Sequence, residues 1–309
     1  MFVPSIQQIE TRNLSWINVN RIGPEEMKYL EENYKFHPLH LADCLSPMQR
    51  PKLDVAPDYL FMVLLFPIYN HRTRELIPSE VDFFISSNYL VTVHNNELPP
   101  LINFFNLCQI SKSQQKKYFV SNPSFLLYEL LYRLMVYCNP IVDNLNLNVR
   151  HIEENIFRGF ERRMVREILV VKRNIVNFRR IIQVHRTVIN KLINKSQPFF
   201  SAGQLKLYFD NLIEMIDEIW DNLENLRQTI EAIERTNNSL ISFKLNDIIK
   251  VLTIISVTTL PITLIASIFG MNARGMPIVG QPGSFWMILI LMAIVSGILF
   301  SFFKKRQWL

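Results

Sequence analysis

Seven residues toward the C-terminal end of the chain carry side chains suited to handling an ion. They recur every three or four positions, and five of the seven are polar. At about 100° per residue they share one helix face about 100° wide. This polar stripe consists of Asn246, Ile249, Thr253, Ser256, Leu260, Thr263 and Ser267. Its oxygens could line an ion pore, whereas hydroxyls can also bond back to their own helix or pack against a neighbouring helix.

The polar stripe runs into the first of two long apolar segments. Residues 251–269 and 285–303 each extend for nineteen positions without a charged side chain. At about 1.5 Å per residue each segment spans roughly 28 Å, close to the hydrocarbon thickness of a bilayer. A buried hairpin of a soluble protein is the alternative, but it needs two such segments by chance. We predict two transmembrane helices joined by an outer loop at 270–284. Because one helix cannot enclose a pore, a pore requires a symmetric oligomer.

Basic residues flank the two segments unevenly. Lys244 and Lys250 precede the first segment, the sequence KKR follows the second, and only Arg274 lies between them. Cytoplasmic flanks carry the excess of Lys and Arg, so both termini are predicted to face the cytoplasm. The start of the chain lacks the pattern of a signal peptide, and three cysteines without a CxxC pair suit a reducing compartment. We expect a multi-pass protein of the cytoplasmic (inner) membrane.

Residues 1–120 show a mixed pattern of strands and helices. Residues 59–69 predict a buried strand that ends near Pro67, and residues 81–94 predict two further strands. Residues 24–34 begin with Pro and acids, which suit the start of a helix. A small sheet with covering helices, forming a cytoplasmic α/β domain, is therefore expected.

The rest of the chain has a helical pattern. We predict a cytoplasmic helical pair over 121–200, a stalk helix over 201–250 and a transmembrane domain over 251–309. Residues 158–195 contain eleven Lys or Arg, and residues 204–234 contain eight Asp or Glu. This pattern favours a basic helix folded beside an acidic one. A nucleic-acid surface is the alternative, but no recognisable binding module accompanies the charge, and no nucleic-acid partner is expected.

Proline and glycine residues, which bend or end helices, occur at few places in this helical region. A bend is expected at Pro140, which lacks the amide hydrogen of a helical residue, and a break is expected near Gly159. No Gly or Pro occurs from Gln204 to Leu260. One very long helix that continues into the first apolar segment is therefore predicted.

The short sequence between the apolar segments is the most specific feature of the chain. It reads Gly270-Met271-Asn272, with Gly-Met-Pro at 275–277, and the chain ends in the basic sequence KKRQWL at 304–309. With these features the C-terminal third resembles the CorA-type magnesium (divalent cation) transporters and channels. The order of sheet, helical pair and stalk helix is similar over nearly the whole chain.

The resemblance implies a CorA-like, funnel-shaped homopentamer. Each chain would contribute an α+β cytoplasmic domain, a long stalk helix and two C-terminal transmembrane helices, the first of which would line the pore. Gly270, Met271 and Asn272 would form the ion entrance. Mg²⁺ loses its water reluctantly, so a carboxamide oxygen and exposed carbonyls would hold the hydrated ion through its water shell. Gly270 would let the helix end and expose those carbonyls.

The resemblance also implies magnesium influx, with cobalt or nickel as further ions. No GxxxxGK[ST] sequence for an ATP-driven pump is present. None is needed, because a divalent ion entering at ~100 mV, negative inside, gains about 4.6 kcal/mol. A transporter of zinc or another divalent cation on the same scaffold is the nearest alternative. A membrane-anchored cytoplasmic interaction protein without transport is the other. The expected partners are other copies of the chain, membrane lipids and divalent cations.

Other candidate sites carry less chemistry. In the family, cytoplasmic Mg²⁺ bound near the stalk helix favours the closed state. The matching position is Asn211, beside Asp210, where an acid is expected, and this departure puts metal sensing in doubt. His37 and His40 could be metal ligands or the start of a helix, and no third ligand follows them. No catalytic grouping, structural metal site or cofactor is predicted, and Mg²⁺ is the transported ion and a candidate regulator.

Overall fold

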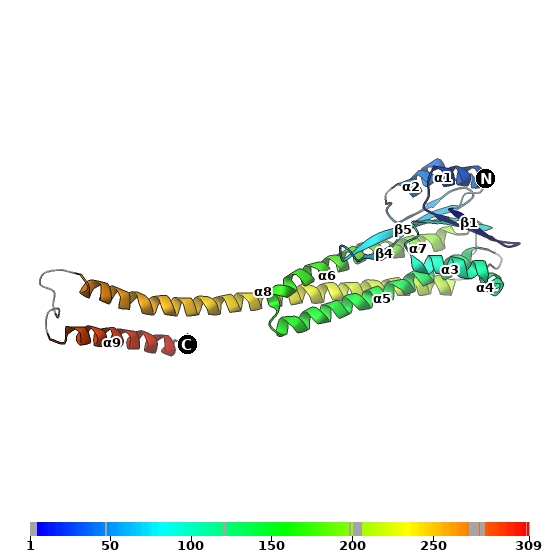
Figure 1. Ribbon diagram of the computed structural model, residues 1–309. Helices are drawn as coiled ribbons and strands as arrows, with labels where there is room; N and C mark the ends of the chain where they lie inside the picture. The colour runs from blue at the N-terminus through cyan, green and yellow to red at the C-terminus, as the bar shows by residue number, and fades with distance from the viewer. Residues whose placement is uncertain are drawn as a thin grey trace. The chain divides into compact units, whose positions relative to one another are not determined.

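The computed structural model describes residues 5–46, 48–119, 122–197, 199, 206–271, 278, 282–306 and 308. The chain forms two units, Met1–Glu234 and Arg235–Leu309. Helix α8, Lys206–Phe269, passes through the boundary as one helix of 64 residues (Figure 1). The prediction of one long helix that continues into the first apolar segment is confirmed.

A six-stranded sheet forms the centre of the first unit. Its strands are β1 (Ile6–Glu10), β2 (Ser15–Asn20), β3 (Lys52–Val55), β4 (Leu60–Asn70), β5 (Glu75–Ile85) and β6 (Tyr89–His94). Their order across the sheet is β1-β2-β6-β5-β4-β3. Strands β2 and β6 are parallel, and all other neighbours are antiparallel. The predicted sheet is thus confirmed, with β2 at the strand-type residues 14–19, whereas β1 and β3 were not expected.

Helices cover both faces of this sheet (Figure 1). They are α1 (Pro24–Tyr34), α2 (Pro38–Leu45), α3 (Pro99–Ile110), α4 (Lys112–Tyr118), α5 (Ser124–Phe157), α6 (Glu161–Ile182) and α7 (His185–Lys195). On the side of α1 and α2, Phe36 stacks on Phe84 of β5 with ring centroids 4.0 Å apart. On the other side, Trp16 of β2 contacts Phe104 and Phe105 of α3 at 5.3 and 4.9 Å.

The first part of α8 completes the core of this unit. Its apolar face is buried at Phe209, Leu212, Ile216, Ile219, Leu223, Leu226, Ile230 and Ile233. Tyr128 of α5 contacts Phe209 with ring centroids 6.3 Å apart. The residues of this face are spaced three and four positions apart in the sequence, and their burial is a main source of stability for the unit.

Ion pairs join the basic helices to the acidic part of α8. Lys172 Nζ lies 2.6 Å from a Glu234 oxygen, and Arg179 lies 2.7 Å from Glu224. Arg186 of α7 lies 3.0 Å from Asp217. These basic and acidic side chains therefore pair with each other within the chain, and the predicted packing of a basic helix beside an acidic one is confirmed.

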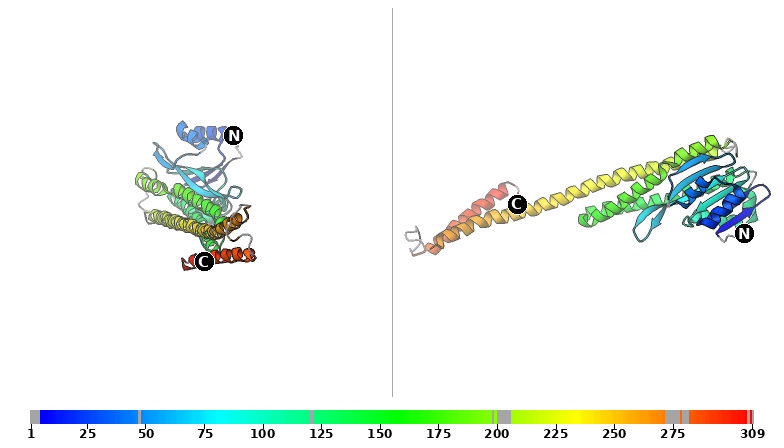
Figure 2. Two further views of the ribbon diagram at one scale, coloured as in Figure 1. Left: turned by 90° about the vertical axis from the view of Figure 1, so that its left-hand side faces the viewer. Right: turned by 90° about the horizontal axis from the view of Figure 1, so that it is seen from above.

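The second unit contains the end of α8 and helix α9, Ser284–Lys305. The views in Figures 1 and 2 agree that α9 runs back beside the second half of α8. Gly283, at φ 95°, precedes α9 in the left-handed conformation that glycine tolerates. These two helices form a hairpin of the kind expected for two consecutive spans.

The structure differs from the sequence prediction at two places. Strand β4 continues past Pro67 to Asn70, because β3 pairs only as far as Val63 and leaves that edge of β4 open. Helix α5 continues through Pro140 as one helix, and the bend expected there stays a prediction. The expected break at Gly159 is present, with φ 92°. A second break separates α6 from α7 without Gly or Pro to signal it.

Candidate ion pathway

The polar stripe faces outward from the second half of α8. Six of its seven members are exposed, and Thr253 is half-buried. Even the apolar members Ile249 and Leu260 are 50% and 68% exposed. Within the described part of the second unit, the stripe is therefore left uncovered and available for contact with other copies or with solvent.

The opposite side of the same helix is partly covered. Half-buried positions recur there at Ile254, Thr258, Pro261, Ile262, Ile265 and Phe269. At about 100° per residue these positions lie on the face turned away from the polar stripe. Helix α9 has its own half-buried or buried positions at Ser284, Ile288, Met292, Val295, Leu299 and Phe303. We infer that α9 packs on the face opposite the polar stripe and leaves the stripe free.

Hydroxyl groups in the stripe bond back to the helix while keeping an acceptor oxygen. Thr253 Oγ1 donates to the carbonyl of Ile249 at 2.7 Å, and Thr263 Oγ1 donates to that of Thr259 at 2.9 Å. A hydroxyl has one hydrogen and two lone pairs, so its oxygen can still accept a hydrogen bond. Back-bonding and pore lining are thus compatible, and these oxygens suit the water shell of a cation.

Pro261 interrupts the hydrogen bonding of α8 within the first apolar segment. Because proline has no amide hydrogen, the carbonyl of Val257 lacks its usual helical partner. Thr258 Oγ1 donates to the carbonyl of Ile254 at 2.7 Å on the half-buried side. The carbonyl of Val257 is therefore a further hydrogen-bond acceptor at the depth of the stripe, and no side-chain pattern in the sequence marks it.

Helix α8 ends directly before the Gly-Met-Asn sequence. The amide of Gly270 donates to the carbonyl of Ala266 at 2.9 Å. A Cβ at position 270 would lie 3.0 Å from that carbonyl oxygen, and the φ of Gly270 is outside the left-handed region. Glycine is therefore favoured here by close backbone approach. Met271 is exposed, and Asn272 lies outside the described residues.

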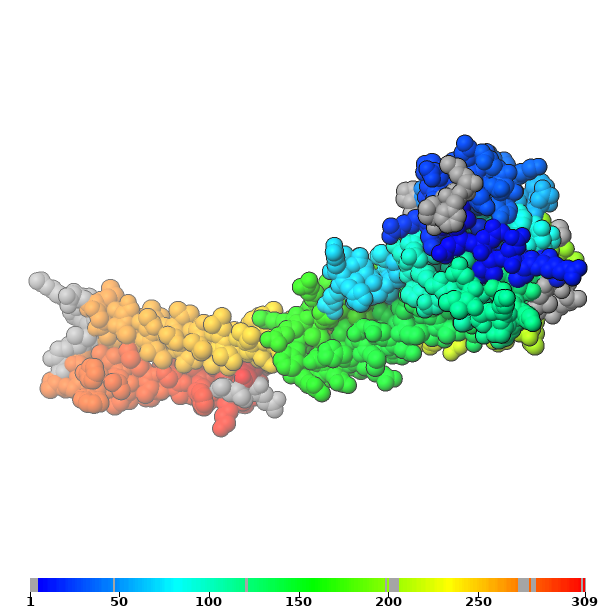
Figure 3. Space-filling view, turned by 45° about the vertical axis from the view of Figure 1, so that its right-hand side comes forward, coloured from blue at the N-terminus to red at the C-terminus, as the bar shows by residue number. Residues whose placement is uncertain are grey.

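Three helices in the described part of the chain are long and apolar enough to cross a membrane. Half of the residues in the most apolar stretch of α5 are buried inside the first unit, whereas none of the residues in the corresponding stretches of α8 and α9 is buried. An apolar surface that the protein itself leaves uncovered suits lipid or other copies. Only α8 and α9 therefore match the two predicted spans, as Figure 3 illustrates in orange and red.

Comparison with known proteins identifies the family. The family model described as "CorA-like Mg2+ transporter protein" matches residues 12–305. The chain belongs to the CorA-like Mg²⁺ transporter family.

Relatives of this CorA-like chain include proteins named as transport proteins. It is 26% identical to the cobalt/magnesium transport protein CorA of Thermotoga maritima over 96% of this chain and 83% of that protein. It is 28% identical to a putative metal ion transporter of Bacillus subtilis, YfjQ, over 97% of this chain and 92% of that protein. Both matches extend across both units of the chain.

A solved structure supports the CorA-like fold. The CorA magnesium transporter of Methanocaldococcus jannaschii matches with a TM-score of 0.83 at 22% identity. The match covers 97% of this chain and 93% of that one. The predicted fold class, an α+β domain with a long helix and two C-terminal helices, is thereby confirmed.

The proposed regulatory residues of the CorA-like chain lie on the first turns of α8. Asp210 is half-buried and Asn211 is exposed. Among the described residues, no three His, Cys, Asp or Glu side chains lie together as metal ligands. A regulatory role for the two residues remains a prediction that needs a second copy or a metal to be tested.

The histidine pair of the CorA-like chain has a structural role. His37 caps the start of α2, and its ring accepts the amide hydrogen of Leu39 at 3.2 Å. The ring of His40 lies 2.9 Å from the hydroxyl of Tyr59. Burial lowers the pKa of His40, which favours its neutral form. The interpretation of this pair as the start of a helix is confirmed.

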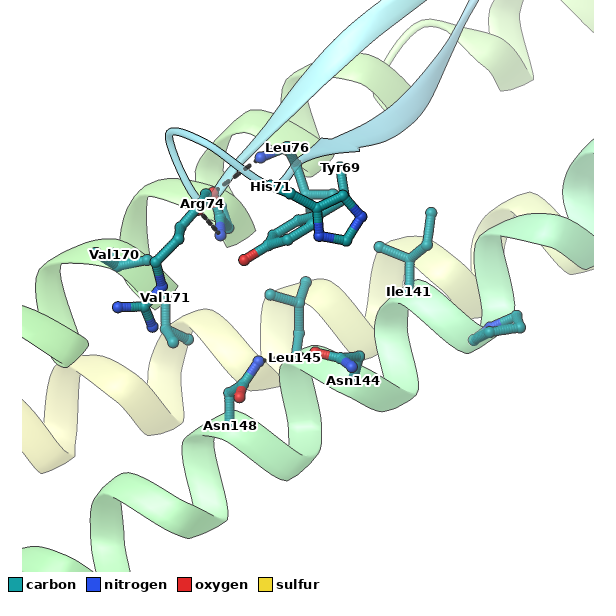
Figure 4. Close-up of a pocket in the computed structure, with 12 residues that line it drawn as sticks. Tyr69, His71, Arg74, Leu76, Ile141, Asn144, Leu145, Asn148, Val170 and Val171 are labelled. Carbon is teal, nitrogen blue, oxygen red and sulfur yellow. Dashed lines mark hydrogen bonds between the residues drawn. The ribbon is translucent and has the colours of Figure 1, made fainter. Parts of the chain in front are cut away.

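An open pocket of about 370 Å³ lies between the β4–β5 hairpin, α5 and α6 (Figure 4). Asn174 of α6 fastens the hairpin beside it, accepting from the amide of Leu76 and donating to the carbonyl of Arg74, both at 3.0 Å. Arg74 also pairs with Glu167 at 2.6 Å and lowers the pKa of that carboxyl. These contacts hold the hairpin against α6, and no sequence motif signals them.

Proposed function

We propose that the chain forms a homopentameric magnesium channel in the cytoplasmic membrane, with both termini in the cytoplasm. The observation that carries this proposal is the polar stripe, which is exposed on the side of α8 opposite the half-buried face. Packing several copies around an axis would turn this stripe inward and leave α9 to face lipid. Cobalt and nickel are further candidate ions.

The chemistry of the stripe suits a hydrated divalent cation. Neutral hydroxyl and carboxamide oxygens accept hydrogen bonds from the waters around the ion without binding it tightly. Rings of Thr253 and Thr263 would supply such oxygens along the pore, and Asn272 would supply a carboxamide ring at the entrance. Weak, repeated sites let an ion enter and leave, and the membrane potential drives it inward.

The family and its named relatives favour magnesium over the alternatives. Relatives are described as magnesium or cobalt/magnesium transport proteins. Zinc transport on the same scaffold would require a different ion ranking. An anchored interaction protein would have no use for an exposed polar stripe within an apolar segment. Gating by cytoplasmic Mg²⁺ at Asp210 and Asn211 is proposed as a regulatory feature that this assembly would allow.

Flux measurements with the full chain in liposomes test the proposal. Wild type is expected to pass Mg²⁺ inward under a negative internal potential. Asn272→Ala is expected to lose most of that flux while assembling normally, because it removes the entrance carboxamide. Asn222→Ala, an exposed carboxamide on the cytoplasmic part of α8, is the matched control and should keep wild-type flux.

The same assay separates the alternatives. Zn²⁺ flux that exceeds Mg²⁺ flux under equal gradients would favour a zinc transporter. Absence of flux for every divalent ion tested would favour an anchored interaction protein. Full Mg²⁺ flux through an assembled Asn272→Ala variant would overturn the entrance assignment. The mass of the detergent-solubilised assembly would decide whether five copies are present.

A further inference from the structure

The region of the turn between α5 and α6 carries three arginines that form no ion pair with the described acids. Along α6 and α7, Lys172, Arg173, Arg179 and Arg186 all pair with acids. The exposed arginines at the start of α6 are Arg162, Arg163 and Arg166. None of these three forms an ion pair with a described acid.

Apolar side chains are exposed among these arginines. Their exposed fractions are 71% for Phe157, 42% for Phe160, 40% for Val165 and 56% for Leu169. At about 100° per residue, Arg162, Val165, Arg166 and Leu169 share one face of α6. Together the three arginines and four apolar residues form a surface that we call the tip patch. It belongs to the α5–α6 region drawn in green in Figures 1 and 3.

The turn presents this patch in a fixed conformation. Gly159 adopts φ 92°, and its amide donates to the carbonyl of Ile156 at 3.1 Å. The amide of Phe160 donates to the carbonyl of Asn155 at 3.0 Å. The guanidinium of Arg163 lies over the ring of Phe160, 5.5 Å from its centroid. The patch is therefore held by backbone hydrogen bonds and a cation–π contact.

Four acids lie near the patch in sequence, and none of them forms an ion pair with its three arginines. Glu153 is exposed, and Glu161 is buried. Glu167 is paired with Arg74, although Arg166 also lowers the pKa of Glu167. Glu154 lies 3.7 Å from Arg158, a further arginine at the turn. The surface is therefore cationic with interspersed aromatic and aliphatic groups, the combination that binds at the boundary between lipid headgroups and acyl chains.

We propose that the tip patch docks on an anionic phospholipid surface. Charge complementarity selects the anionic headgroup, and the exposed Phe and Leu side chains supply the apolar contact. The chain also brings this surface within reach of a membrane. Only residues 235–250, which are helical within α8, separate the first unit from the apolar segment, and sixteen helical residues rise about 24 Å. The tether makes even weak docking effective, because the lipid is always near.

This docking does not depend on which ion the chain transports. Each arginine near an anionic surface strengthens binding by about five-fold, so three contribute on the order of 100-fold. Docking would couple the α5–α6 pair to the lipid composition of the membrane. Loss of lipid docking with intact Mg²⁺ flux would overturn only the docking proposal. Loss of Mg²⁺ flux with intact docking would overturn only the proposed function.

An environment-sensitive fluorophore on Phe157→Cys in the full chain tests the proposal. Cys44 is replaced by Ser, while Cys108 and Cys138 are buried. The protein is reconstituted in phosphatidylcholine alone and in phosphatidylcholine with phosphatidylglycerol. We expect a blue shift in the anionic membrane that added salt reverses. R162Q/R163Q/R166Q should lower the ratio of docked to undocked tip by on the order of 100-fold.

A matched charge change controls for net charge. Lys112, Lys116 and Lys117 are exposed on α4, and K112Q/K116Q/K117Q removes the same number of positive charges. This variant should dock as wild type does. An equal signal in both lipid mixtures, or an unchanged signal in the arginine variant, would overturn the proposal. A blue shift in lipid-free detergent that grows with protein concentration would assign the patch to another protein copy, and a shift produced only by added RNA would assign it to nucleic acid.

Discussion

The two units of the chain differ in how far their apolar and polar side chains are buried or paired within the chain. In the unit Met1–Glu234, the apolar face of α8 is buried and its acids pair with Lys172, Arg179 and Arg186. In the unit Arg235–Leu309, the same helix exposes apolar side chains such as Leu252 and leaves the polar stripe uncovered. The first unit buries its own apolar face and pairs its charges, whereas the second unit leaves both its apolar and its polar side chains exposed.

This difference separates stability from transport. Substitutions in the buried half of α8 should change unfolding, because the contacts they remove lie within one chain. Substitutions in the exposed half should change flux, because the groups they remove act only in an assembly. A single helix therefore allows both effects to be compared under one set of conditions.

The largest expected effect is on the buried half. Leu223 is fully buried, and Leu223→Ala should lower the free energy of unfolding by about 3 kcal/mol through lost burial and a residual cavity. Leu207, 81% exposed on the same helix, provides the control, and Leu207→Ala should change stability by less than about 0.5 kcal/mol. Denaturant unfolding of the purified protein measures both. Equal effects would contradict the assignment of a buried face.

The second expected effect is a pH dependence of stability that comes from a buried histidine of the first unit. His185 is fully buried, and burial lowers its pKa from 6.5 to about 4. The unfolded chain therefore binds a proton more readily between these values, and stability should fall as pH drops from 6.5 to 4. His185→Phe should reduce this loss by on the order of 3 kcal/mol.

Melting temperatures across that pH range measure the effect of His185. The difference between the variant and wild type is the informative quantity, because other groups titrate in both proteins. Asp82 acts in the opposite direction, since burial raises its pKa. Parallel curves for the two proteins would show that His185 does not contribute to acid sensitivity.

The third effect concerns the exposed half of α8. Thr253→Val and Thr258→Val each remove a hydroxyl that donates to the carbonyl four residues earlier. Thr253 belongs to the polar stripe, and Thr258 lies on the half-buried opposite side. We expect Thr253→Val to lower Mg²⁺ flux by at least about five-fold, as one lost hydrogen bond per chain implies. Thr258→Val should leave flux near wild type, and equal losses would contradict the orientation of the stripe.

The smallest effect comes from an exposed ion pair of the first unit. Arg186 and Asp217 are 3.0 Å apart, with side chains 60% and 39% exposed. Arg186→Ala should cost less than about 1 kcal/mol, and added salt should shrink that cost. Melting temperatures at low and high salt measure it. A large cost that salt does not change would mean that the pair is more shielded than its exposure indicates.

Periodic and compositional features were predictable from the sequence. The buried face of α8, the pairing of basic with acidic helices and the two spans each follow from repeats of three or four residues or from uncharged runs. The polar stripe was also predictable, because four polar residues on one face of an apolar segment, continued by Asn246 before it, are unusual. Family membership rested on Gly270, Met271 and Asn272 in that context.

Features that depend on tertiary contact were not predictable. The clamp of Asn174 on the β4–β5 hairpin joins residues about a hundred positions apart, and no local pattern marks it. The extension of β4 past Pro67 depends on the short length of β3. The close approach of Gly270 to the carbonyl of Ala266 was not predictable either, because it depends on the backbone conformation at the end of α8.

The order of α8 along the chain has a consequence for biosynthesis. Its buried half is the last element of the first unit, and the apolar segments follow it. When Glu234 has been added, every element of the first unit has been made, while residues 235–309 still require roughly 4 to 15 s of translation at 5–20 residues per second. The apolar segments therefore leave the ribosome after the first unit, whose core can close before membrane insertion begins.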